Sequence, residues 1–132
     1  ILDVRAAVEC LEKNKGARKD TLVLVGASIG ANLTLQYMTE NSEIKKGVLL
    51  SPGLDYRGVK TDVLIQKLYS SQRVLLLASE DDTHGSFESI RALHALNPAK
   101  TEKREFLNLG HGTTMFERKP ELMDEVIHFI KT

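Results

Sequence analysis

The chain of 132 residues has no tryptophan, one cysteine and three prolines, and neither sign of charge is in excess. The single cysteine, Cys10, cannot form an internal disulfide, which favours a reducing compartment such as the cytoplasm. We expect Cys10 to be a small buried hydrophobic residue on a helix. Because aromatic residues make up only 5% of the chain, no stacking platform for bases or sugars is expected.

The balance of charge bears on the partners of the protein. Lysine and arginine together number 18, aspartate and glutamate also number 18, and the two signs are mixed along the chain. This balance favours neither nucleic acid nor a membrane surface as a partner. No signal-like segment is present, and no apolar run approaches the roughly 18 residues that a membrane-spanning helix needs.

Hydrophobic residues make up 42% of the chain. That content and length suit a single domain over residues 1–132 and are too small for two ordinary domains. A helical pattern begins directly at Ile1, with no capping residue or turn before it. We therefore expect the chain to be the C-terminal part of a longer protein.

Helical segments and short apolar runs alternate along the chain, and this order predicts an α/β fold with a parallel sheet flanked by helices. The continuous apolar runs are typical of strands that are buried on both faces of such a sheet. The expected strands are residues 21–25, 47–51, 73–78 and 104–108. The expected helices are residues 2–14, 29–38, 86–96 and 120–130, with a short helix or a loop containing one at 59–69.

Directly after the first expected strand comes the pattern Gly26-Ala27-Ser28-Ile29-Gly30. A G-x-S-x-G sequence between a strand and a helix is typical of a nucleophile elbow, a sharp turn that exposes a serine hydroxyl. The glycines remove Cβ atoms that would collide in the turn. A glycine-rich turn with an inactive serine and a phosphate-binding turn are the alternatives, although the lysine of a P-loop is missing. We predict that Ser28 is a nucleophile and that the Ile29 N–H stabilises an oxyanion.

Acidic residues and a histidine follow later strands. Asp81 and Asp82 come after the third expected strand, and His111 lies between two glycines after the fourth. The carboxyl ends of parallel strands meet at one edge of a sheet, so these side chains are expected near the serine. The chain order Ser, Asp, His is the order of a catalytic triad on this kind of sheet. Asp55, after the second strand, is a further candidate for the acid.

The segments LVLVGASIGAN, GVLLSPGLDYRG, RVLLLASEDD and LNLGHGT resemble the C-terminal half of the α/β-hydrolase fold, and most closely small esterases of the dienelactone-hydrolase-like kind. The resemblance implies an α/β-hydrolase-like sheet that lacks the N-terminal strands. It also implies a triad of Ser28, His111 and an aspartate. Asp82 is preferred because the family's G-x-x-D pattern then places Ser79 at the glycine, with Asp81 as the alternative.

The resemblance implies a serine hydrolase that cleaves a small-molecule carboxylic ester or thioester through an acyl-enzyme, with no cofactor and no metal. Acyltransferase and peptidase chemistry use the same triad. The family's second oxyanion donor comes from a loop that has no counterpart in this sequence. The alternative function is therefore a truncated or impaired hydrolase domain with a role in binding or assembly. A sheet without its N-terminal strands would expose an edge, so self-association into a homo-oligomer is also expected.

Residues 52–72 leave no room for a substantial lid, which predicts an open site. Tyr56 and Arg57 in this stretch are interpreted either as pocket residues or as part of a surface loop. His84 is expected to be a solvent-exposed loop residue. The alternative is a metal site with Asp81, Asp82 and His111, but their spacing has no metal-ligand signature. Met115 is expected to pack in the core.

Overall fold

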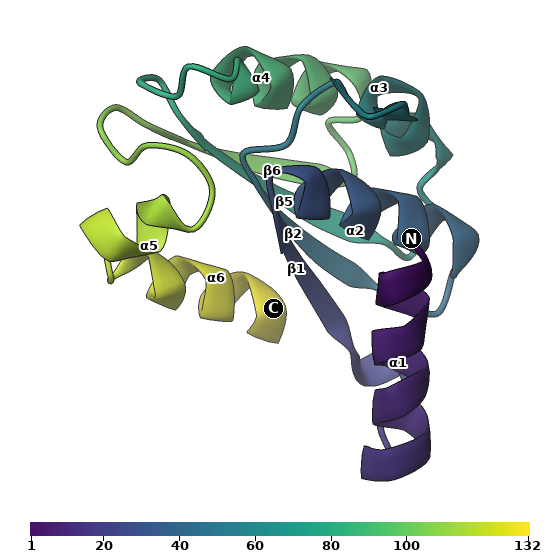
Figure 1. Cartoon of the computed structure of the whole chain (residues 1–132). Coiled ribbons are helices and arrows are strands. Elements are labelled where there is room, and N and C mark those ends of the chain that lie inside the picture. The colour runs from purple at the N-terminus through teal and green to yellow at the C-terminus, as the bar shows by residue number, and fades with distance from the viewer.

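A four-stranded parallel sheet lies at the centre of the computed structural model, which describes residues 1–132 (Figure 1). Its strands, in spatial order, are β1 (Val23–Ala27), β2 (Lys46–Leu50), β5 (Arg73–Ser79) and β6 (Thr101–Phe106). Each strand pairs in parallel with the next one in this order. The predicted parallel sheet flanked by helices is confirmed.

Helices cover both faces of the sheet, as Figure 1 shows. One face carries α1 (Leu2–Lys15), α2 (Ile29–Glu40), α3 (Thr61–Leu64) and α4 (Ser86–Leu96), and the other carries α5 (Thr114–Arg118) and α6 (Leu122–Lys131). Two short 3₁₀ helices complete the elements, at Lys19–Thr21 and Ile65–Lys67. None of these helices has the length and apolar character required to cross a membrane.

The two faces of the sheet bury separate clusters of apolar side chains. Leu76 of β5 packs into a cluster of 15 buried residues beneath α1, α2 and α4. Its neighbours Leu75 and Leu77 point the opposite way, into a cluster of 8 residues with α5 and α6. This alternation explains why the strand is apolar without interruption. Met115, expected in the core, is fully buried in the second cluster.

The sequence did not predict every element correctly. The last strand, β6, begins at Thr101 rather than at Arg104. Its charged residues lie at the sheet edge and are only partly buried, so no apolar run marks the start of the strand. Residues 55–60 form an antiparallel hairpin of β3 (Asp55–Tyr56) and β4 (Val59–Lys60) that the sequence did not predict, whereas α3 and the 3₁₀ helix that follows it lie within the expected 59–69. Strands of two residues carry no periodicity that a sequence pattern can detect.

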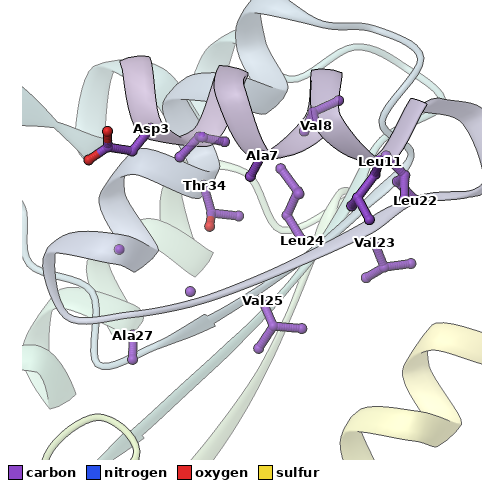
Figure 2. A pocket seen from close by; sticks show the side chains of 13 residues that line it. Asp3, Ala7, Val8, Leu11, Leu22, Val23, Leu24, Val25, Ala27 and Thr34 are labelled. Carbon is purple, nitrogen blue, oxygen red and sulfur yellow. The ribbon is translucent and has the colours of Figure 1, made fainter. Parts of the chain in front are cut away.

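Strand β1 departs from the expectation that it is buried on both faces. It pairs only with β2, so its outer edge is free, and Val25 is 50% exposed. A largely apolar groove of about 440 Å³ runs between this edge and α1. Figure 2 shows Leu24 pointing toward α1 across this groove, while Val25 points to the other face of the strand.

Cys10 is exposed, so the prediction that it is buried was wrong. The α1 residue that enters the core is Val8, which is 2% exposed. Two residues along a helix correspond to more than half a turn, and this rotation carries Cys10 to the solvent side.

Candidate active site

Ser28 occupies a strained turn between β1 and α2. Its backbone has φ 55° and ψ −124°, a conformation that L-residues rarely adopt. A Cβ atom on Gly26 would lie 2.2 Å from the carbonyl oxygen of Gly30, so position 26 accepts only glycine without rearrangement. A Cβ atom on Gly30 would meet nothing within 4 Å. Both glycines were expected to prevent a collision in the turn, but only Gly26 does so.

The backbone around Ser28 supplies hydrogen-bond donors at the start of α2. The Ser28 N–H donates to the carbonyl oxygen of Leu50 at 2.9 Å, which fixes the turn to the end of β2. Ile29 is the first residue of α2, and the first N–H groups of a helix have no carbonyl partner within that helix. The positive end of the helix dipole also favours negative charge here.

Asp82 is a buried carboxylate at the end of β5, and its side chain is 0% exposed. It accepts hydrogen bonds from Nδ1 of His111 at 2.6 Å, from the backbone N–H of His84 at 2.8 Å and from the Ser86 hydroxyl. Burial raises the pKa of Asp82, but these hydrogen bonds outweigh burial and bring the pKa down to about 2. Asp82 is therefore ionised at neutral pH.

The adjacent carboxylate, Asp81, makes no hydrogen bond to the His111 ring. It accepts a hydrogen bond from the Ser79 hydroxyl at 2.6 Å and pairs with the Arg118 guanidinium at 3.1 Å. The hydrogen bond from Ser79 is the largest influence on the pKa of Asp81, and it lowers that pKa. Of the two neighbouring aspartates, only Asp82 contacts the imidazole.

The loop that carries His111 is held by two buried serines that the sequence analysis did not identify as site residues. Ser51, at the end of β2, accepts a hydrogen bond from the Gly112 N–H at 2.8 Å. Ser79, at the end of β5, accepts one from the Leu109 N–H at 2.8 Å. The available signal was a serine at the end of each of two apolar runs.

His111 makes its hydrogen bond to Asp82, and no hydrogen bond joins the ring to Ser28 in this structure. A carboxylate can only accept, so Nδ1 of His111 carries the hydrogen and Nε2 of the neutral ring is free to accept one. Catalytic hydrogen bonds are often long in the absence of substrate and shorten in the reactive complex.

His84 is an exposed loop residue, as expected, but it also contacts the site. Its side chain is 58% exposed, but Nδ1 also donates to Asp82 at 3.1 Å, and its ring lies 4.2 Å from the ring of His111. One potential ligand atom from each of these three residues lies within 4.8 Å of the others. Because both oxygens of Asp82 already accept hydrogen bonds, a metal ion would have to displace these contacts.

The β3–β4 hairpin contributes a further side chain to this region. Arg57 and Gly58 form its two-residue turn, with φ values of 52° and 84°. Asp55 accepts a hydrogen bond from the Gly58 N–H at 2.8 Å, so it serves the turn and does not contact His111. Arg57 is exposed at the turn, whereas the hydroxyl of Tyr56 is buried within interaction range of Ser28.

No family model matches the sequence, and no curated protein matches it either. Solved structures do match. An esterase of Pyrococcus furiosus is similar with a TM-score of 0.79 and 18% identity, covering 98% of this chain and 60% of that one. A predicted CIB-like hydrolase of Thermoplasma acidophilum matches with a TM-score of 0.73 and 15% identity, covering 97% and 58%. An α/β serine hydrolase homologue of Coxiella burnetii matches with a TM-score of 0.71 and 17% identity. The match covers 94% of this chain and 54% of that one.

These similarities show an α/β-hydrolase-like fold. The chain spans between 54% and 60% of the length of these three proteins. Identities of 15–18% support the fold alone, so the chemistry has to be argued from the residues of this chain.

Proposed function

We propose that this protein is a serine hydrolase that cleaves a carboxylic ester or thioester through an acyl-enzyme on Ser28. The observation that carries the proposal is the 2.6 Å hydrogen bond between the buried Asp82 and His111, at the same sheet edge as the strained serine. The esterase and hydrolase names of the similar structures agree with it. Known hydrolases of several classes use this constellation of residues.

The mechanism follows from the contacts of each residue. His111 takes the proton of Ser28 as the serine oxygen attacks the acyl carbonyl carbon. Asp82 holds the ring in the tautomer that leaves Nε2 free, and its negative charge stabilises the imidazolium that forms. The N–H of Ile29 donates to the oxyanion. His111 then protonates the leaving group, and water repeats the two steps to release the acid.

A second candidate function is a hydrolase-like domain without catalysis, in which the fold serves binding or assembly. One observation favours it: no hydrogen bond joins Ser28 to His111 in this structure. This candidate predicts a folded protein whose serine is unreactive.

Labelling with a fluorophosphonate probe separates the two candidates. The proposal predicts that the folded chain is labelled, that mass spectrometry finds the adduct on Ser28, and that Ser28→Ala is not labelled. Ser42→Ala, at an exposed serine, is the matched control and should label like the wild type. A folded wild-type chain that does not react would refute the hydrolase proposal.

A further inference from the structure

The hydroxyl of Tyr56 is a buried polar group without a well-formed hydrogen bond. It exposes less than 1 Å² and makes no hydrogen bond of good geometry. Buried hydroxyls are paired in nearly all native structures, so an unpaired one next to a candidate nucleophile calls for an explanation. The neighbours within interaction range are the Ser28 side chain and the Asp82 carboxylate.

The structure fixes the Tyr56 ring in place. Its hairpin turns through Arg57 and Gly58, both with positive φ, as a tight two-residue β-turn requires. The ring packs directly on the backbone of Gly53, where an added Cβ would lie 2.7 Å from the carbon that bears the hydroxyl. A side chain at position 53 would therefore displace the tyrosine.

The hairpin is attached to the helix that follows the nucleophile. Asn32, which is fully buried on α2, donates to the carbonyl oxygens of Gly53 and Val59 at 3.0 Å each. It also accepts a hydrogen bond from the Gly53 N–H at 3.1 Å. Asn32 lies four residues after Ser28, one helical turn further along. One helix therefore positions both the serine and the tyrosine.

The phenol is in its neutral form at physiological pH. Burial raises the pKa of Tyr56 above its ordinary value, and the negative charge of Asp82 raises it further. The nearby Ser28 side chain lowers the pKa without reversing the shift. The hydroxyl therefore keeps its hydrogen and is able to donate it.

We propose that the Tyr56 hydroxyl donates a hydrogen bond to the oxyanion formed on Ser28, as a second donor beside the Ile29 N–H. In the attack, the bond from Ser28 Oγ to the carbonyl carbon forms, the π electrons move to the carbonyl oxygen, and the serine proton passes to His111. The oxyanion and Oγ are then bonded to the same carbon, so a donor near Oγ also reaches the oxyanion. The Ser28 side chain interacts with this hydroxyl in the free protein, and it leaves the hydroxyl free to donate when it turns toward His111.

This inference rests on the proposed function, and Tyr56→Phe tests it because the ring stays and only the hydroxyl is lost. We expect kcat for p-nitrophenyl butyrate to fall about 10²–10³-fold with little change in KM, as when one oxyanion donor is removed. The affinity for a trifluoromethyl ketone, which forms a stable oxyanion adduct, should fall in parallel. Tyr69→Phe, at a half-exposed tyrosine, is the matched control and should leave both values unchanged.

The outcomes separate the two claims. If the wild type hydrolyses the ester and Tyr56→Phe matches it in kcat and in inhibitor affinity, the role of Tyr56 is refuted and the hydrolase proposal stands. If the folded wild type is inert toward ester and fluorophosphonate, both claims fail.

If Tyr56→Phe does not fold, 3-fluorotyrosine at position 56 replaces it. That variant keeps the hydroxyl but ionises at lower pH, so its kcat should decline at alkaline pH before that of the wild type. Coinciding profiles would refute the inference.

Discussion

At the scale of single residues, two adjacent aspartates have different surroundings. Asp82 is buried against His111, whereas Asp81 is bound to Ser79 and to the exposed Arg118. The two side chains have the same chemistry, so substitution of each by asparagine separates the effect of position from the effect of charge.

We predict that Asp82→Asn lowers kcat about 10⁴-fold, because the amide favours the wrong tautomer of His111 and no longer stabilises its charged form. Asp81→Asn removes the same charge one residue away and should cause a much smaller loss. Steady-state hydrolysis of p-nitrophenyl butyrate by both variants measures the difference. Equal losses would show that Asp82 has no special role.

The low pKa of Asp82 predicts a pH dependence of stability. Its pKa is about 2 in the folded chain and ordinarily 3.8, so the folded state gains stability at pH values above about 4. This stability is lost as the pH falls from about 4 to 2. Ser86→Ala removes one hydrogen bond to the carboxylate and should cost about 1.5 kcal/mol at pH 7.

The cost of Ser86→Ala should shrink as the pH approaches 2, because protonated Asp82 no longer gains from the charge-assisted bond. Urea denaturation at a series of pH values measures it. Ser89→Ala is the control, because its hydroxyl bonds the carbonyl oxygen of Gly85 and no titrating group. A cost of Ser86→Ala that is constant with pH would contradict the assigned cause.

At the scale of elements, the turn at Ser28 is a close contact between the end of β1 and the first turn of α2. Gly26→Ala places a methyl group 2.2 Å from the carbonyl oxygen of Gly30, so the strand and the helix must separate. We expect a loss of about 1–3 kcal/mol in unfolding free energy, or more. Thermal and urea denaturation followed by circular dichroism measure it.

Gly30→Ala is the matched control for this element. The added methyl group meets nothing within 4 Å, and alanine favours the helix over glycine by about 1 kcal/mol. Gly30→Ala should therefore be neutral or slightly stabilising. If Gly26→Ala and Gly30→Ala lost similar amounts of unfolding free energy, the close contact between strand and helix would not be the reason for glycine at position 26.

At the scale of the whole molecule, the sheet has an unpaired edge at β1 beside an apolar groove. Self-association through this edge remains a prediction. Val25→Lys adds a charge to a strand residue that is 50% exposed and should weaken association about tenfold or more. Val63→Lys, at an exposed valine on α3, is the control. Sedimentation equilibrium over a wide concentration range distinguishes them, and a wild type that stays monomeric would refute self-association.

Local patterns predicted much of this architecture. The apolar runs of β2 and β5 are buried on both faces, so their sequences alone identify them. The edge strand β6 was misplaced because edge strands carry charged residues that resemble a loop. The β3–β4 hairpin was missed because each of its strands has only two residues.

The parallel sheet, the turn at Ser28 and the candidate residues at the strand ends follow from the sequence alone, because they depend on local sterics and on the order of segments. The tertiary structure was needed to show that Asp82 rather than Asp81 contacts His111. It was also needed to show that the His84 ring lies beside that ring, tilted against it, and that the Tyr56 hydroxyl is buried near the serine. These contacts join side chains from separate elements, and which side of a loop a side chain faces is fixed by packing, which no spacing along the chain records.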